Sequence, residues 1–215
     1  MSIALVAREI CETLNDRIEH SGCTVPRIEA LTLLERAAHE YEQRLQAVGR
    51  DAWNAPSSCD RWTVKELADH VVGGNRSALA LLDGKEFEQA FAESRAAGFD
   101  GDPIESFRQS AEGQLAAFGA PGALQRNVHH VTGEMPASQL FVFRIGELLI
   151  HGWDLARSTG GDEHMDAELT EIVWEVWQPL LVVNESNRFG DGPSGAVADD
   201  APLGLRLLDL TGRRP

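Results

Sequence analysis

The most informative part of this sequence is the apolar stretch 137–159, in which four charged or titratable residues recur at helical spacing. At about 100° of rotation per residue, Arg144, Glu147, His151 and Asp154 fall within about 80° of one another on one helix face. Apolar residues border this polar stripe on both sides, so we expect it to face the protein interior. An ionisable group in such a place must be paired, neutralised or bound to a metal ion.

A second histidine, His70, lies in another segment with helical spacing, 63–82. Apolar residues such as Val71 lie on the same side, which places His70 toward the core. Gly73 and Gly74 follow it, although a glycine inside a helix costs about 1 kcal/mol relative to alanine. One explanation is that a ligand or a neighbouring helix needs the space beside His70.

Two imidazoles and one carboxylate, from His70, Glu147 and His151, make a candidate metal site. Glu147 and His151 are four residues apart, so both side chains can reach one ion. This ligand set suits Zn²⁺, Fe²⁺, Ni²⁺ or Mn²⁺, and three protein ligands leave positions for water or substrate. The residues alone also allow another interpretation, in which the histidines are hydrogen-bonded core residues and Glu147 pairs with Arg144.

Helices must position these side chains, and the sequence predicts an all-α protein. Apolar residues recur every three or four positions, and the alternation typical of strands never exceeds about four residues. The expected helices are 3–20, 27–48, 63–82, 102–119, 137–159 and 166–184, with a short helical turn at 203–210 and a loop at 121–136. A capping box, Thr63 with Glu66, marks the start of the helix that carries His70.

Composition excludes several classes of partner. The chain has 215 residues, 43% of them hydrophobic, and a net charge of −15. This length and apolar content predict a folded core, and the charge argues against binding to nucleic acid or an acidic membrane surface. The sequence shows no signal peptide and no membrane-spanning stretch. Cys11, Cys23 and Cys59 lack C-x-x-C spacing, which favours free thiols and a cytoplasmic location.

Two segments carry a family resemblance. Residues 62–73, WTVKELADHVVG, and residues 146–156, GELLIHGWDLA, resemble the two signature segments of the DinB-like metalloproteins. The closer resemblance is to the branch that contains the mycothiol-dependent maleylpyruvate isomerase N-terminal domain, and within it to a short, single-domain group. It extends over about Arg27 to Asn184.

The resemblance implies an up-down four-helix bundle that binds Zn²⁺ or another divalent ion, and the family's ligands fall on His70, Glu147 and His151. The expected organisation is an N-terminal helical extension, 1–26, a DinB-like metal-binding bundle, 27–184, and an irregular C-terminal tail packed on it, 185–215. Two more residues are candidates for orienting the ligands. Asp154 can accept the free N–H of a ligand imidazole or make an ordinary helical hydrogen bond, and Arg144 lies on the same face.

The resemblance also implies chemistry on a low-molecular-weight thiol such as mycothiol. A free thiol has a pKa of about 8.5 and a metal-bound thiol is deprotonated, so the thiolate can attack a small electrophile. We therefore expect a thiol-dependent transferase or isomerase, as a monomer or homodimer. Residues 161–215 are too few for the second domain of the two-domain isomerase, which makes transferase the broader expectation.

Two other functions fit the same residues. One is a non-catalytic bundle that binds a metal or small ligand, and the other, less favoured, is a 2-His-1-carboxylate Fe²⁺ enzyme. His129 and His130 lie in the expected loop before the ligand helix, and no spacing ties them to the site.

Overall fold

The helices expected from the sequence are present with nearly the expected bounds. The structure, a computed structural model, describes residues 26–59, 62–99, 101–131, 133–184 and 192–215. Within these residues the expected helices are α2, Pro26–Gln46; α3, Val64–Leu82; α5, Pro103–Gly119; α6, Ala137–Thr159; α7, Ala167–Asn184; and α8, Leu203–Leu210. The expected helix 3–20, and with it the N-terminal extension, lies outside the described residues.

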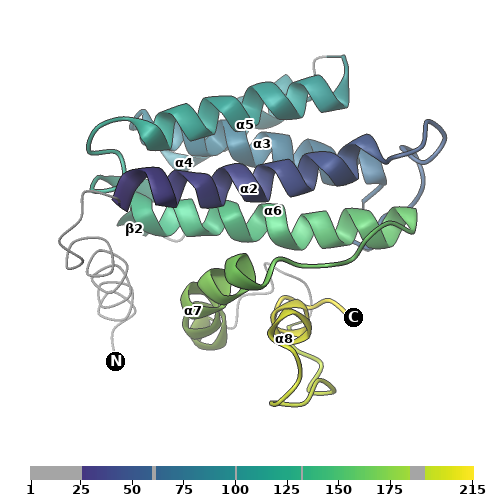
Figure 1. The fold of residues 1–215 in the computed structure, drawn as a ribbon. Coiled ribbons are helices and arrows are strands. Elements are labelled where there is room, and N and C mark those ends of the chain that lie inside the picture. The colour runs from purple at the N-terminus through teal and green to yellow at the C-terminus, as the bar shows by residue number, and fades with distance from the viewer. Residues whose placement is uncertain (1–25, 60–61, 100, 132, 185–191) are drawn as a thin grey trace. The chain divides into compact units, whose positions relative to one another are not determined.

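Helices α2, α3, α5 and α6 form a four-helix bundle (Figure 1). Helix α2 packs against α5 and α6, and α3 packs against the same two helices. Helix α6 is the most enclosed, because both flanks of its polar stripe are buried, as the side chains of Leu148 and Ile150 show. The prediction of an all-α fold built on a four-helix bundle is confirmed.

An additional helix, α4, spans Phe87–Ala97 and was not expected from the sequence. It packs on α3, where the hydroxyls of Ser77 and Ser94 lie 2.8 Å apart. Because α4 carries the chain back along α3, helices α3 and α5 run in the same direction. The two helices are joined near their middles, where the side-chain amide nitrogen of Asn75 donates to Ser110 Oγ at 3.0 Å.

The segment expected as a loop before α6 contains a short hairpin instead. Strands β1, Asn127–His130, and β2, Gly133–Pro136, pair antiparallel. Gly133 opens β2 with φ 108°, a backbone conformation that favours glycine. The hairpin leads directly into the first residue of α6, so it sets where the helix that carries Glu147 and His151 begins.

The start of α3 is fixed by the predicted capping box. The Glu66 backbone N–H donates to Thr63 Oγ1 at 3.2 Å, and the Thr63 backbone N–H donates to Glu66 Oε2 at 2.8 Å. This satisfies backbone donors that would otherwise lack partners in the first turn. It also fixes the position of His70, which follows less than two turns later.

The chain divides into two compact units, one spanning Val25–His164 and the other containing Met165–Pro215. In the second unit, α7 packs against α8, and the Arg206 guanidinium lies 4.6 Å from the centre of the Trp174 ring. The domain limits expected from the resemblance, with a bundle over 27–184, stay a prediction. Among the described residues, no helix is both long and apolar enough to cross a membrane.

Candidate metal centre

The fold brings His70, Glu147 and His151 together between α3 and α6. Glu147 Oε2 lies 3.0 Å from His70 Nε2 and 3.3 Å from His151 Nε2. One ligand atom from each of the three residues lies within 4.8 Å of the other two. A Zn²⁺ ion with bonds of about 2.0–2.2 Å needs donor atoms about 3.3–3.6 Å apart, so small side-chain shifts are enough for these residues to hold one.

The exposure of the three side chains differs and defines an open side. His70 is 37% exposed, Glu147 is 16% exposed and His151 is 7% exposed. The Trp62 ring lies 4.7 Å from the His70 ring and 6.1 Å from the His151 ring, centre to centre. The centre is therefore reached past His70, beside the face of an indole, and not through the bundle core.

The pKa shifts of the three triad residues favour a positive charge beside the Glu147 carboxylate. Burial acts to raise the pKa of Glu147, but hydrogen bonds with His151 and His70 outweigh it and hold this pKa well below its usual range. Burial acts to lower the pKa of His151, but hydrogen bonds with Asp154, Cys59 and Glu147 hold it well above its usual range. For His70, burial prevails and its pKa is lowered despite Glu147. The protonated His151 ring thus lies between the carboxylates of Glu147 and Asp154. A bound metal ion would supply the same positive charge.

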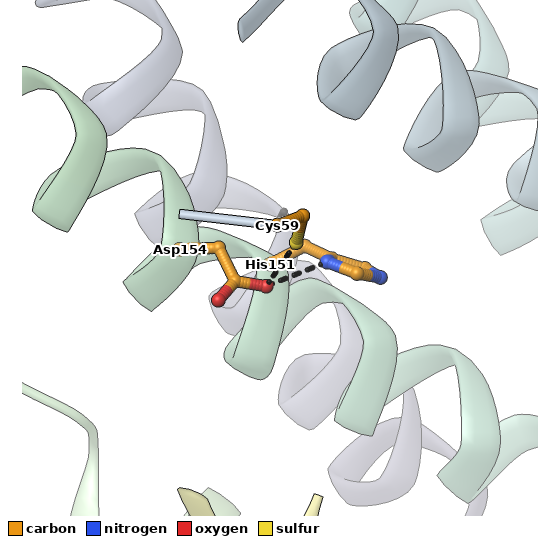
Figure 2. Close-up of side chains that lie close together, drawn as sticks. All are labelled: Cys59, His151 and Asp154. Atoms are coloured by element: carbon orange, nitrogen blue, oxygen red, sulfur yellow. Dashed lines mark hydrogen bonds and ion pairs between the residues drawn. The ribbon is translucent and has the colours of Figure 1, made fainter. Parts of the chain in front are cut away.

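Asp154 contacts the Nδ1 edge of the His151 ring (Figure 2), whereas Glu147 contacts its Nε2 edge. Its carboxylate oxygen Oδ2 accepts the Nδ1 proton of His151 at 2.9 Å and the Cys59 thiol proton at 3.2 Å. Asp154 is fully buried, so its charge acts on these two partners with little screening by water. This is the geometry in which a carboxylate fixes the tautomer of a metal-binding histidine and leaves Nε2 for the ion.

Arg144 lies on the same face of α6 but bonds elsewhere. Its guanidinium Nη2 donates to Asn75 Oδ1 at 3.0 Å and to the Val71 carbonyl at 3.5 Å. The Arg144 side chain is buried, and its Nε has no hydrogen-bond partner among the described residues. Arg144 therefore joins α6 to α3 one turn from the triad rather than pairing with Glu147.

The two loop histidines lie on the hairpin and have other neighbours. His129 is exposed, with Nε2 3.9 Å from Glu86 Oε1. The His130 ring lies 5.5 Å from the Phe87 ring and 5.8 Å from the Phe143 ring. These contacts place the pair against the start of α4 and the first turns of α6 rather than against the triad.

Sequence reasoning missed the side chains that reach the centre from irregular structure. Cys59 and Trp62 lie in the connection between α2 and α3, whose path helical periodicity does not describe. Trp62 stands in the signature segment that ends near His70, which was the available signal for its place at the site. Nothing in the spacing of Cys59 links it to Asp154, which lies 95 positions further along the chain.

Solved structures share this fold. The chain superposes on the mycothiol-dependent maleylpyruvate isomerase with a TM-score of 0.59 and on a histidine-to-alanine mutant of that enzyme with 0.62. Each comparison covers 78% of this chain and 74% of the other, at 18% sequence identity. At this identity the likeness concerns the fold alone.

Similar sequences occur in Mycobacterium tuberculosis. Two proteins described as uncharacterised, from strains CDC 1551 and H37Rv, are each 28% identical over 175 residues. The match covers 81% of this chain and 89% of each relative.

The family comparison covers the part of the chain that builds the centre. The model of the mycothiol maleylpyruvate isomerase N-terminal domain matches residues 34–156, which include His70, Glu147, His151 and Asp154. This match extends over more than half of the chain and confirms the resemblance found in the two signature segments. The chain therefore belongs to the mycothiol maleylpyruvate isomerase N-terminal domain family, and its four-helix bundle has that family's DinB-like fold.

Proposed function

We propose that this protein is a divalent-metal-dependent enzyme that uses a low-molecular-weight thiol, mycothiol, to transform a small electrophile by transfer or isomerisation. The observation that carries the proposal is the meeting of His70, Glu147 and His151 at the accessible edge of a buried cluster. Family membership supports the thiol, because the solved relatives are described as mycothiol-dependent.

In this proposal His70 Nε2, Glu147 Oε2 and His151 Nε2 hold the ion, for which Zn²⁺ is the first candidate and Ni²⁺, Fe²⁺ and Mn²⁺ the others. When bound, the metal supplies a positive charge that favours the thiolate form of the cosubstrate. The other steps belong to the chain itself. Asp154 keeps the proton on His151 Nδ1, so that Nε2 remains available. The Trp62 indole lines the approach beside His70 and leaves an apolar surface for the substrate.

Metal content is the first test. The purified full chain is compared with His70→Ala and with the control His39→Ala, whose histidine is exposed on α2. We expect stoichiometric divalent metal in the unchanged chain and in the control, and one equivalent less in His70→Ala. Equal metal content in all three would contradict the triad, and bound iron in place of zinc would favour the Fe²⁺ enzyme.

Turnover is the second test. The metal-loaded protein is incubated with mycothiol and either maleylpyruvate or a panel of small electrophiles, and products are identified by mass spectrometry. We expect a thiol-dependent isomer or an S-conjugate that His70→Ala does not form. Metal binding without any product would support the non-catalytic binding bundle instead.

A further inference from the structure

The buried side of His151 carries a second set of metal-binding side chains, formed by Cys59, His151 and Asp154 (Figure 2). Cys59 Sγ lies 3.2 Å from Asp154 Oδ2, and His151 Nδ1 lies 2.9 Å from the same oxygen. One donor atom from each of the three lies within 4.8 Å of the others. This set uses Nδ1 of the imidazole, whereas the triad with His70 and Glu147 uses Nε2, so the two sets lie on opposite edges of one ring.

The loop that carries Cys59 is held against α6 by several hydrogen bonds. The Ser58 backbone N–H donates to Ser158 Oγ at 2.8 Å, and Ser58 Oγ donates to the Asp154 carbonyl at 3.0 Å. The loop itself is closed by the Ser57 N–H, which donates to the Trp62 carbonyl at 2.8 Å. Hydrogen bonds of the neighbouring residues therefore place the thiol beside Asp154, and ordering it on ligand binding costs little conformational entropy.

We propose that Cys59 Sγ, His151 Nδ1 and Asp154 Oδ2 form a second divalent-metal site, which shares the His151 imidazole as a bridge with the proposed triad. A thiolate, an imidazole nitrogen and a carboxylate favour an ion of intermediate softness such as Zn²⁺ or Co²⁺ over Mg²⁺ or Ca²⁺. The inference goes beyond the proposed enzyme, because it concerns other ligands and does not require turnover.

The charges balance when an ion enters this site. Three bonds to the metal form, and two bonds to hydrogen break, those of Cys59 Sγ and His151 Nδ1, whose protons pass to solvent. One divalent cation thus replaces two protons, and the net charge of the buried cluster does not change. Since burying an unbalanced charge is the main cost of a buried ionic site, this exchange removes that cost.

Tyr41 provides independent support. Its side chain is fully buried in α2, and its hydroxyl has no hydrogen-bond partner among the described residues. The Tyr41 ring lies against α6 next to His151, because a Cβ at Gly152 would lie 3.7 Å from Tyr41 Cδ2. Burial raises the pKa of Tyr41, and Asp154 and Cys59 raise it further. A buried hydroxyl without a partner needs an explanation, and a water molecule or hydroxide on a nearby ion would be an acceptor for it.

Cobalt titration tests the proposal in the full chain, with Cys11→Ser and Cys23→Ser introduced so that Cys59 is the single thiol. We expect two equivalents of Co²⁺, one of which produces the near-ultraviolet sulfur-to-cobalt charge-transfer band. Adding Cys59→Ser should remove that band and one equivalent. Adding His70→Ala should remove the other equivalent and keep the band, so a failure of the triad is distinguished from a failure of this site.

Two results would overturn the second site. One is a single equivalent without a thiolate band in the parent chain, and the other is a band that persists after Cys59→Ser. Circular dichroism of each variant shows whether it is folded. Because Cys59→Ala keeps the hydrogen-bonded loop and lacks a ligand atom, it serves as a second variant if the serine form is unstable.

Discussion

The guanidinium of Arg144 lies against the backbone of Gly74, in the space that any side chain at position 74 would fill. A Cβ at this position would lie 2.8 Å from the Arg144 Cζ. The second glycine has another environment, since a Cβ at Gly73 would have Ser94 Oγ as its nearest neighbour at 4.0 Å. The two adjacent glycines of α3 therefore have different roles, and Gly74 is the one that lets α6 place a buried cation beside α3.

Gly74→Ala should therefore destabilise the protein, by about 1–3 kcal/mol. The new methyl group displaces the guanidinium, which is buried and gives up its hydrogen bond to Asn75. The matched control is Gly73→Ala, which should be neutral or stabilising by up to about 1 kcal/mol, because alanine is the better helix former. Urea unfolding of the two variants measures the difference, and equal effects at both positions would contradict the assigned contact.

Metal binding should stabilise the fold through Glu147. A ligand that binds the folded state alone, at about 100 times its dissociation constant, adds about 2.7 kcal/mol to the free energy of unfolding. We expect Zn²⁺ to raise the thermal midpoint of the unchanged chain, and a chelator to reverse the shift. Glu147→Gln should reduce the response, while Glu112→Gln, on the exposed face of α5, should keep it in full. A zinc-induced shift of undiminished size in Glu147→Gln would exclude this carboxylate as a ligand.

Asp154→Asn should weaken metal binding without removing a residue of the triad. The amide keeps the size of the side chain and loses the negative charge that holds the proton on His151 Nδ1. Loss of such a carboxylate typically costs about 10–100-fold in metal affinity. Asp83→Asn, at the exposed end of α3, is the control and should bind normally. Competition with a chromophoric chelator measures the metal affinities of the two variants and of the unchanged chain. A decrease in affinity of less than threefold in Asp154→Asn would argue that Asp154 has only a helical hydrogen-bonding role.

The metal-free protein should lose stability as the pH rises above neutrality. Its partners raise the pKa of His151 in the folded protein well above 6.5, the value expected in the unfolded chain. Protonation of His151 therefore stabilises the fold fully at a pH below 6.5. This stabilisation is lost as the pH rises through the pKa of the folded protein. The pKa of His70 is lowered, so this residue affects stability only at a pH below about 6.5. The pH dependence above 6.5 is therefore attributed to His151.

Urea unfolding of the protein, made metal-free with a chelator, across about pH 6.5 to 9 measures how its free energy of unfolding changes with pH. His151→Gln should flatten this dependence. With Zn²⁺ present the trend should reverse, because the ion competes with the His151 proton. A metal-free protein whose stability rises over this window would show that His151 is not held protonated.

The parts of the fold that sequence reasoning predicted are those that a regular helix determines. Once 137–159 is a helix, the rotation per residue fixes that Glu147, His151 and Asp154 share a face, and the apolar flanks fix which face is buried. Helix α4 escaped prediction because its pattern is weak: its buried residues are Ala90 and Ser94, and Phe91 is exposed. Cys59 escaped because its position depends on hydrogen bonds between a loop and α6, which no periodicity encodes.

The unequal exposure of His70 and His151 has a kinetic consequence. In the proposed enzyme, a centre that opens on one side would admit its two reactants in sequence. The molecule that binds deepest, against His151, would have to arrive before the one that binds beside His70 and Trp62. The last to arrive is also the first able to leave. For two small molecules that react at this centre, initial-rate measurements should therefore show compulsory-order addition. An excess of the reactant that binds beside His70 and Trp62 should slow the dissociation of the one that binds against His151.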